Sequence, residues 1–296
     1  MRLFGKLVNP SSSSPGTPEV LESQKAALLK LLSDEDPLVY AKVREKILSY
    51  GQSAGQWVRR ESLSNEPLVR RRAQEIIEHL GRQAADNKFL AFCLNQGEEF
   101  DLEHASLLLA QTHYPEINID AYHALFDNFA SDLRMRINLA AGPDAILATI
   151  NHYLFTELGF TANEQNYYDL ENTYLSRVID RRTGNPISLC LVYLFVGRRL
   201  KLPLAGIGMP NHFVLRYQSS TREIYIDAFH SGKLLMKADC IKYLVQTSGF
   251  QEAYLAPVSA RRTLLRMCSN LHQIYLQMQK PDEVSRLQRY IVALAK

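Results

Sequence analysis

Two residues of this 296-residue sequence could act together as a base and its orienting acid: His212 and Asp227. Short segments of alternating polar and apolar residues, 212–217 and 222–227, predict an antiparallel hairpin. With a four-residue loop at 218–221, His212 lies directly opposite Asp227, where paired side chains are about 4.5 to 5.5 Å apart. The carboxylate can then accept a hydrogen bond from the imidazole, as in a catalytic base and its orienter.

The apolar residues of the hairpin select this register. They form one face, whereas a slip of one residue would set Phe213 against Asp227. The residues of that apolar face are Phe213, Leu215, Ile224 and Ile226. The other predicted pairs are Val214 with Tyr225, Arg216 with Glu223 and Tyr217 with Arg222.

The residues before the hairpin predict a buried helix. Asn185 fits its N-cap, Pro186 fits the first helical position, and residues 187–196 are apolar at almost every position. A helix apolar on nearly every side belongs in a core. Its first turn offers free N–H groups and the positive end of the dipole, where a fold with a thiolate nucleophile would place it. The predicted fold class is α+β, a mostly helical chain with a small antiparallel sheet packed on this helix.

A repeat precedes these elements. Residues 32–39 recur as 63–69, and each copy carries a proline, Pro37 or Pro67, and is followed by a glycine, Gly51 or Gly81. Each copy predicts a helix that begins at the proline and ends at the glycine, similar to HEAT-like repeats, over residues 20–85. The Ser- and Pro-rich residues 1–19 predict a flexible leader.

The remaining segments are also helical in pattern. Residues 86–160 carry apolar residues at helical spacing, and residues 258–296 predict two amphipathic helices around Pro281. The acidic residues of 94–102 lack the regular ligand spacing of a hard-cation loop, so they predict a helix start rather than a metal site. We expect the α+β core at residues 161–248.

Composition narrows the classes of function. The 34 basic and 31 acidic residues leave a net charge of +3, which gives no general attraction to nucleic acid or to an anionic membrane. The arginines at 70–72 predict a solvated helix face. The apolar run 186–197 is too short to span a membrane, and the four cysteines are too dispersed for a disulfide framework or a zinc site. We expect a cytoplasmic protein with buried thiols, no metal and no cofactor.

Four segments resemble the SirB-type branch of the transglutaminase-like superfamily: residues 166–175, 181–189, 209–213 and 226–232. The resemblance extends over about residues 86–248. It implies a papain-like α+β core near residues 161–248, followed by a tetratricopeptide-like helical hairpin at residues 258–296.

The resemblance also implies a catalytic triad of Cys, His and Asp for acyl transfer or amide hydrolysis. His212 and Asp227 match the second and third members. The cysteine position falls near Pro186, so the usual nucleophile is absent. Two substitutes remain: Ser188 in the first turn of the helix, and Cys190 half a turn further, whose apolar neighbours predict a raised pKa.

These residues leave two main hypotheses open. In the first, the chain is a regulatory interaction protein that binds a protein or peptide partner through a degenerate core. In the second, it is a hydrolase or acyltransferase that uses Cys190 or Ser188 with His212 and Asp227 on an amide or isopeptide bond. Nucleic-acid binding through the arginines at 59–60 and 70–72 ranks last, because no aromatic stacking residues accompany them. The oligomeric state is left open.

Overall fold

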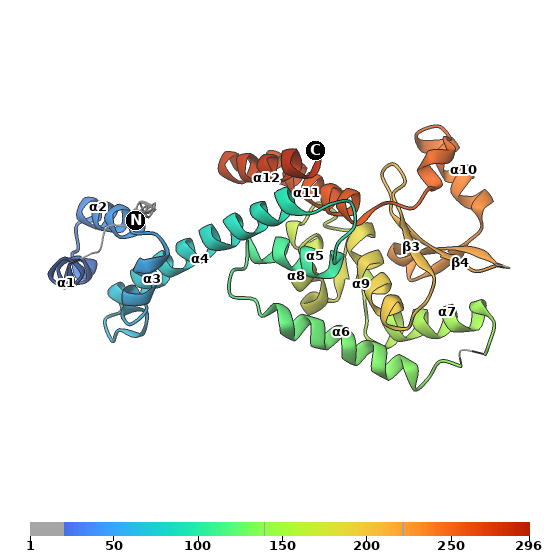
Figure 1. Ribbon diagram of the computed structural model, residues 1–296, viewed down its shortest axis with the longest axis horizontal. Helices are drawn as coiled ribbons and strands as arrows, with labels where there is room; N and C mark the ends of the chain where they lie inside the picture. The colour runs from blue at the N-terminus through green and yellow to red at the C-terminus, as the bar shows by residue number, and fades with distance from the viewer. Residues whose placement is uncertain (1–20, 139, 221) are drawn as a thin grey trace, which may run out of the picture. The chain divides into compact units, whose positions relative to one another are not determined.

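The computed structural model describes residues 21–138, 140–220 and 222–296, which divide into two compact units (Figure 1). The first unit ends at Ala84 and the second comprises residues 85–296. The flexible leader predicted at residues 1–19 lies outside the described residues. Among the described residues, no helix combines the length and hydropathy that a membrane span requires.

The first unit is helical, and its prolines begin helices as predicted. Its elements are α1 (Glu22–Lys30), η1 (Leu31–Ser33), α2 (Pro37–Leu48), α3 (Gln52–Val58), η2 (Glu61–Leu63) and the first part of α4 (Pro67–Asn95). Pro37 is the first residue of α2, and Asp36 caps that helix by accepting a hydrogen bond from the backbone N–H of Leu38 at 2.8 Å. Periodic apolar residues, among them Val43, Ile47, Ala73 and Ile76, form its core.

Two expectations for this unit are wrong. Gly81 does not end its helix, because α4 continues to Asn95. An internal glycine costs a helix only about 1 kcal/mol relative to alanine, and the following residues, through Ala84 and Ala85, favour helix. Arg72 does not share the solvated face of Arg70 and Arg71: it is buried and donates hydrogen bonds to the carbonyls of Leu32 and Asp34 at 2.9 and 2.5 Å.

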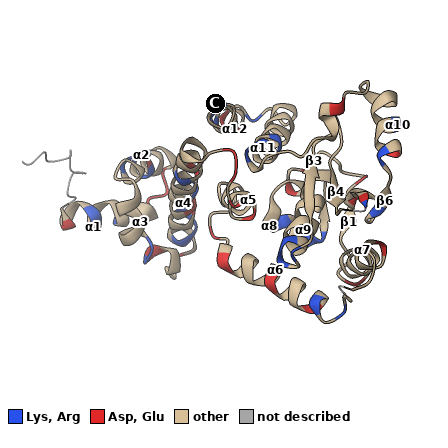
Figure 2. Ribbon diagram, turned by 45° about the vertical axis from the view of Figure 1, so that its right-hand side comes forward, with Lys and Arg blue, Asp and Glu red and all other residues tan. Residues whose placement is uncertain are grey.

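In the second unit, α9 (Pro186–Arg199) is surrounded by helices that come both before and after it in the sequence (Figure 1). These are α5 (Leu102–Gln111), α6 (Ile119–Arg134), α7 (Pro143–Asn151), the π-helical turn η3 (His152–Glu157), η4 (Leu170–Asn172), α8 (Leu175–Arg181), α10 (Lys237–Thr247), η6 (Glu252–Leu255), α11 (Ala260–Gln277) and α12 (Pro281–Leu294). Residues 186–197 of α9 are all buried, so the predicted central helix is confirmed. Basic and acidic residues are spread over the helices of both units (Figure 2).

A four-stranded antiparallel sheet packs on α9, with the strand order β3 (Leu204–Ile207), β4 (Val214–Gln218), β5 (Glu223–Asp227) and β6 (Lys233–Leu235). A short parallel pair, β1 (Thr161–Ala162) and β2 (Thr183–Gly184), lies before it in the sequence. The predicted α+β class is confirmed. Sequence analysis missed β3 within the link after the helix, because its residues, Leu-Ala-Gly-Ile, show no polar and apolar alternation.

The predicted hairpin joins β4 and β5, but its register is offset by two residues. Leu215 pairs with Ile226 and Arg216 pairs with Tyr225, so the pairing of Val214 with Tyr225 is wrong. Gln218 still pairs with Glu223, so the loop begins one residue later than predicted. An offset of two residues preserves the faces of a strand, which is why the apolar pattern did not detect it.

Both faces of the hairpin are covered. Phe213, Leu215, Ile224 and Ile226 join the main core with α9, as predicted. On the other face, Val214 and Tyr225 pack with Cys240 and Leu244 of α10 in a smaller cluster. Because both faces are buried, the hairpin is held in one position against α9, and its open end is positioned with it.

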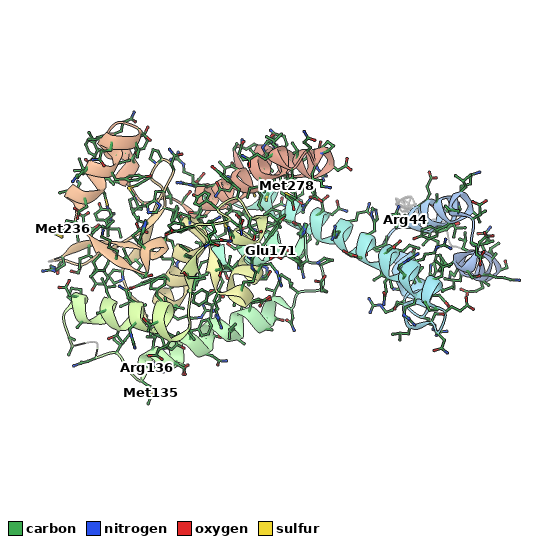
Figure 3. The ribbon with its side chains drawn as sticks, turned by 180° about the vertical axis from the view of Figure 1, so that it is seen from behind. Arg44, Met135, Arg136, Glu171, Met236 and Met278 are labelled. Atoms are coloured by element: carbon green, nitrogen blue, oxygen red, sulfur yellow. The ribbon has the colours of Figure 1, made fainter. Side chains whose placement is uncertain are left out.

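Polar contacts tie the remaining segments to this core. Glu171, labelled in Figure 3, accepts hydrogen bonds from Tyr114 at 3.0 Å, Arg177 at 2.9 Å and Arg181 at 2.7 Å. At the C-terminal end, α11 and α12 form the predicted helical hairpin around Pro281. Arg266 of α11 donates to the carbonyls of Met209 and His212 at 2.8 and 2.9 Å, and thereby holds the segment that precedes β4.

Candidate functional site

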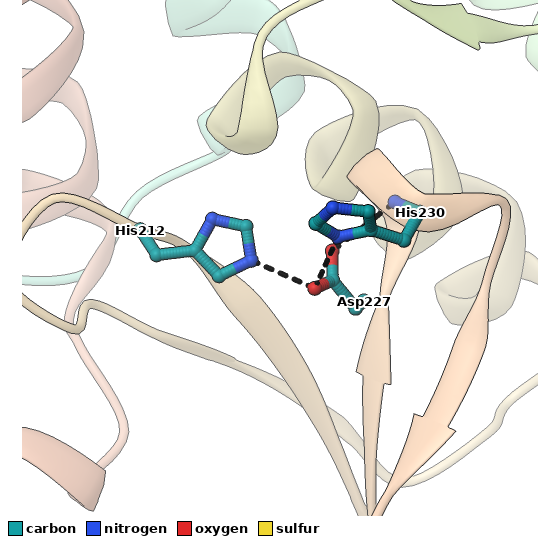
Figure 4. Close-up of side chains that lie close together, drawn as sticks. All are labelled: His212, Asp227 and His230. Carbon is teal, nitrogen blue, oxygen red and sulfur yellow. Dashed lines mark hydrogen bonds and ion pairs between the residues drawn. The ribbon is translucent and has the colours of Figure 1, made fainter. Parts of the chain in front are cut away.

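His212, Asp227 and His230 form one polar cluster at the open end of the hairpin (Figure 4). His212 Nε2 and His230 Nδ1 each lie 2.8 Å from the same atom, Oδ2 of Asp227. The other carboxylate oxygen, Oδ1, accepts from the backbone N–H groups of Phe229 and His230 at 3.1 and 3.3 Å. The contact predicted between His212 and Asp227 is therefore present.

The offset register explains how this contact forms. His212 precedes the first residue of β4, so it approaches Asp227 from a diagonal position rather than from a directly opposed one. Asn211 turns the chain with a φ of 58°, and Arg266 holds the carbonyl of His212. Two aromatic rings flank the imidazole, with centroids 5.7 Å away for Tyr243 and 6.4 Å away for Phe229.

His230 is the member that sequence analysis missed. It ends the 3-10 turn η5 (Ala228–His230), which Asp227 caps, so that its ring returns over the carboxylate three residues earlier. The sequence signal is a histidine at position i+3 from an aspartate that ends a strand. This spacing was visible in the sequence, but nothing there predicted that the strand would give way to a tight turn.

The carboxylate of Asp227 is buried, with a side chain only 7% exposed. Burial alone would raise the pKa of Asp227, but the hydrogen bonds and charges of His212 and then of His230 outweigh it and hold this pKa below its ordinary value. The ionised carboxylate is thus the favoured form, and it can orient both imidazoles.

The first turn of α9 contains no thiol. Pro186 occupies the first helical position, and Ser188 completes a capping box: its Oγ accepts from the Asn185 backbone N–H at 3.0 Å, while Asn185 Oδ1 accepts from the Ser188 backbone N–H at 3.0 Å. Ser188 Oγ also donates to the Asn185 carbonyl at 3.1 Å. The Ser188 hydroxyl therefore already uses its hydrogen-bonding groups within the cap.

Cys190 lies deeper in the core. Its side chain is fully buried and its Sγ donates to the carbonyl of Phe213 at 3.4 Å. Burial, and next the charge of Asp227, raise the pKa of Cys190 well above that of a free thiol. Among the described residues, neither Cys190 nor Ser188 forms a hydrogen bond with His212. Their predicted roles as substitute nucleophiles stay predictions.

A cavity of about 570 Å³ opens over the start of α9. His212 lies in its wall, together with aromatic and amide side chains from the segment before α8 and from α11. Its lining includes Tyr167, Tyr168, Asn185, Pro186, Ile187, Asn211, Phe213, Arg266, Asn270, Gln273 and Ile274. A second cavity, of about 390 Å³, lies beside α10, and its wall includes all three members of the His212, Asp227 and His230 cluster.

This fold and site, a buried helix facing a strand pair that carries a His–Asp contact, define a papain-like class of protein. The family model described as the transglutaminase-like superfamily matches residues 120–269, half of the chain. The chain belongs to the transglutaminase-like superfamily. The matched range contains Ser188, Cys190, His212, Asp227 and His230.

Similar proteins occur in bacteria and in animals. A UPF0162 protein of Xylella fastidiosa (strain 9a5c) is 31% identical over 204 residues, covering 67% of this chain and 73% of that protein. The F-box only protein 21 of Mus musculus is 38% identical over 149 residues, 48% of this chain but 23% of that protein. A UPF0162 protein of Vibrio cholerae is 26% identical over 161 residues, covering 54% of this chain and 59% of that protein. No solved structure matches the chain.

Proposed function

We propose that this chain is a cytoplasmic, regulatory protein-interaction module, a SirB-type transglutaminase-like protein that binds a protein or peptide without catalysing acyl transfer. One observation supports this above the others: the helix turn that faces the His–Asp pair presents Pro186 instead of a thiol. A base and its orienter without a nucleophile cannot begin covalent catalysis. The helices that precede and follow the core in the sequence, which we interpret as HEAT-like and tetratricopeptide-like, fit the same role, because such helices commonly present docking surfaces.

The cavity over the start of α9 supports a peptide as the ligand. Its volume of about 570 Å³ accommodates several residues of an extended chain. Tyr167 and Tyr168 are 39% and 62% exposed and offer aromatic surface, which is enriched at protein interfaces. Asn270 and Gln273 offer amide groups that can both donate to and accept from a peptide backbone.

The charge of this cavity also favours a peptide over a polyanion. Among the residues that line this cavity, Arg266 is the one basic residue apart from His212. Its guanidinium is committed to the carbonyls of Met209 and His212, and burial lowers its pKa. A largely neutral wall of aromatic and amide groups suits the uncharged backbone of a peptide better than a chain of phosphates.

A binding experiment tests this proposal. A displayed library of random peptides is selected on the immobilised full chain, and the affinity of a fluorescent version of a selected peptide is measured by anisotropy. We expect Tyr168→Ala and Gln273→Ala each to weaken binding at least tenfold. Phe250→Ala, which removes an aromatic ring that is 40% exposed outside the cavity, should leave the affinity unchanged. Equal affinity of all three variants would contradict the assignment of the cavity.

Thiol labelling tests the rival enzymatic hypothesis. All four cysteines are buried, and burial raises the pKa of Cys93 and of Cys240 to about 12. We expect iodoacetamide to label Cys190 in the native chain no faster than Cys93, Cys240 or Cys268. If Cys190 reacts much faster and His212→Ala abolishes that rate, a working nucleophile is present. Turnover of an amide or isopeptide substrate that Ser188→Ala or Cys190→Ala abolishes would equally overturn the binding-only proposal.

A further inference from the structure

The cluster at the open end of the hairpin has the composition of a transition-metal site. It brings together two imidazole nitrogens and one carboxylate oxygen, and these three atoms all lie within 4.8 Å of one another. Imidazole suits zinc, copper, iron and nickel, whereas magnesium and calcium prefer oxygen ligands alone. A set of two histidines and one carboxylate is a recurring ligand set for such ions.

We propose that His212, Asp227 and His230 bind one divalent transition-metal ion, with Zn²⁺ as the representative, through Nε2, Oδ2 and Nδ1. No metal was expected from the sequence, because the ligands are separated by 14 and 2 intervening residues and match no common zinc motif. The proposal concerns a different cavity from the one proposed to bind a peptide: the two cavities share His212, but neither Asp227 nor His230 lines the peptide cavity.

Small side-chain movements would convert the hydrogen-bonded cluster into a coordination shell. Zinc holds N and O ligands at about 2.0–2.2 Å, so two ligands of a tetrahedral ion lie about 3.4 Å apart. The two 2.8 Å contacts to Oδ2 would therefore lengthen slightly, and the two imidazole nitrogens, which lie within 4.8 Å of each other, would take up a similar separation. His230 can make this adjustment because its side chain is 55% exposed. Each imidazole then carries its proton on the other ring nitrogen.

The residues around Asp227 already hold its carboxylate in an orientation that suits metal binding. Oδ1 of Asp227 is held by two backbone N–H groups of the turn that follows it, so Oδ2 is left to face both imidazoles. Metal ligands are usually oriented by such outer hydrogen bonds. On the histidine side, Arg266 fixes the backbone carbonyl of His212 at 2.9 Å.

The fourth coordination position would face the cavity of about 390 Å³ beside α10, whose wall contains all three ligands. Three protein ligands and one open position are typical of catalytic rather than structural zinc sites. Lys233 and Lys242 line the same cavity, so water or a small anion suits that position. Such an ion would occupy Nε2 of His212, and this histidine could then not serve as a general base.

Cobalt binding provides the test. The full chain is stripped with a chelator and titrated with Co²⁺ under visible spectroscopy, and Zn²⁺ affinity is measured by calorimetry. We expect one ion per chain, absorption bands of four-coordinate Co²⁺ with N and O ligands, and displacement of Co²⁺ by Zn²⁺. Absence of stoichiometric binding would overturn the proposal. So would a sulfur-to-cobalt charge-transfer band, because it would assign the ion to a cysteine such as Cys240.

Variants locate the ion. His230→Ala removes a half-exposed ligand and should weaken Zn²⁺ binding at least tenfold. The matched control is His152→Ala, which removes a histidine whose side chain is 63% exposed and which also contacts a carboxylate, that of Glu157 at 3.5 Å. The control should bind Zn²⁺ like the unaltered chain. Equal affinity of His230→Ala and the unaltered chain would show that the ion binds elsewhere and would overturn the assignment.

Discussion

The start of α9 and the open end of the β4–β5 hairpin face each other, but they use their polar groups differently. At the helix start, Asn185 and Ser188 satisfy each other within a capping box, and the thiol of Cys190 lies in the core. At the hairpin end, Asp227 gathers two imidazoles that line a cavity. The helix side therefore contributes stability, whereas the hairpin side retains groups that can act on a ligand.

This difference bears on how a transglutaminase-like core can carry Pro186 in place of a thiol at the helix start and stay folded. The helix start needs only a cap and an apolar face, and Pro186 suits the first helical position better than most residues. At the hairpin end, Asp227 is harder to replace, because it also caps the turn η5. Removal of the carboxylate would release the turn as well as the imidazoles. Changes on the two sides should therefore have effects of different size and kind.

Truncation of the central helix should have the largest effect. Leu194 is 3% exposed within α9, so Leu194→Ala should lower the free energy of unfolding by about 2–5 kcal/mol through lost burial and a residual cavity. Denaturant unfolding measures it, with Leu276→Ala, 46% exposed on α11, as the matched control. A loss below about 1 kcal/mol at Leu194 would mean that α9 is not the centre of the core.

Removal of the carboxylate of Asp227 should have the second-largest effect on the free energy of unfolding. Asp227→Ala deletes the acceptor of two imidazoles and of two backbone N–H groups, and should cost about 2–3 kcal/mol, as expected for buried partners left unsatisfied. Asp227→Asn keeps an acceptor for the turn and should cost less. Chemical denaturation in the presence of a chelator compares the two variants. Equal losses would mean that the cap of η5 contributes nothing separate from the imidazole contacts.

Loss of the capping hydroxyl should have a smaller effect. Ser188→Ala removes half of the capping box of α9 and should cost about 1 kcal/mol. Ser269→Ala, which removes a hydroxyl bonded only to a carbonyl within α11, is the control and should cost less. Thermal unfolding of both variants measures the difference. If Ser188→Ala left stability unchanged and altered turnover of an amide, the two sides of the site would no longer differ in kind.

Much of this arrangement could be predicted from sequence, because local rules determine it. The N-cap Asn185 and the apolar run after it specified α9, and alternation specified the apolar face of the hairpin that packs on α9. The absolute register could not be read in the same way, since an offset of two residues leaves every face unchanged. Only packing between distant segments, such as Arg266 with His212, selects between such alternatives.

The polar cluster was predicted only in part for a related reason. His212 and Asp227 could be paired from strand geometry, but His230 enters through a 3-10 turn that Asp227 itself caps. The role of Ser188 is also determined locally, because a serine three residues after Asn185 fits a capping box. From the sequence, Ser188 was considered only as a nucleophile. Residues with two competing uses, one structural and one chemical, are the ones that a sequence alone does not assign.

The smallest expected effect on stability is also the sharpest test of the difference between the two sides. His230 contributes a half-exposed ring and one side-chain contact to the buried carboxylate of Asp227, and a contact with one partner this exposed is worth about 0.5 kcal/mol. Without metal, His230→Ala should therefore change the free energy of unfolding by about 0.5 kcal/mol or less. Added Zn²⁺ should stabilise the unaltered chain but not this variant, because an ion that binds only the folded state shifts the unfolding equilibrium. If His230→Ala cost as much as Asp227→Ala without metal, the cluster would be a structural network like the cap of α9, and the hairpin side would hold no groups free for a ligand.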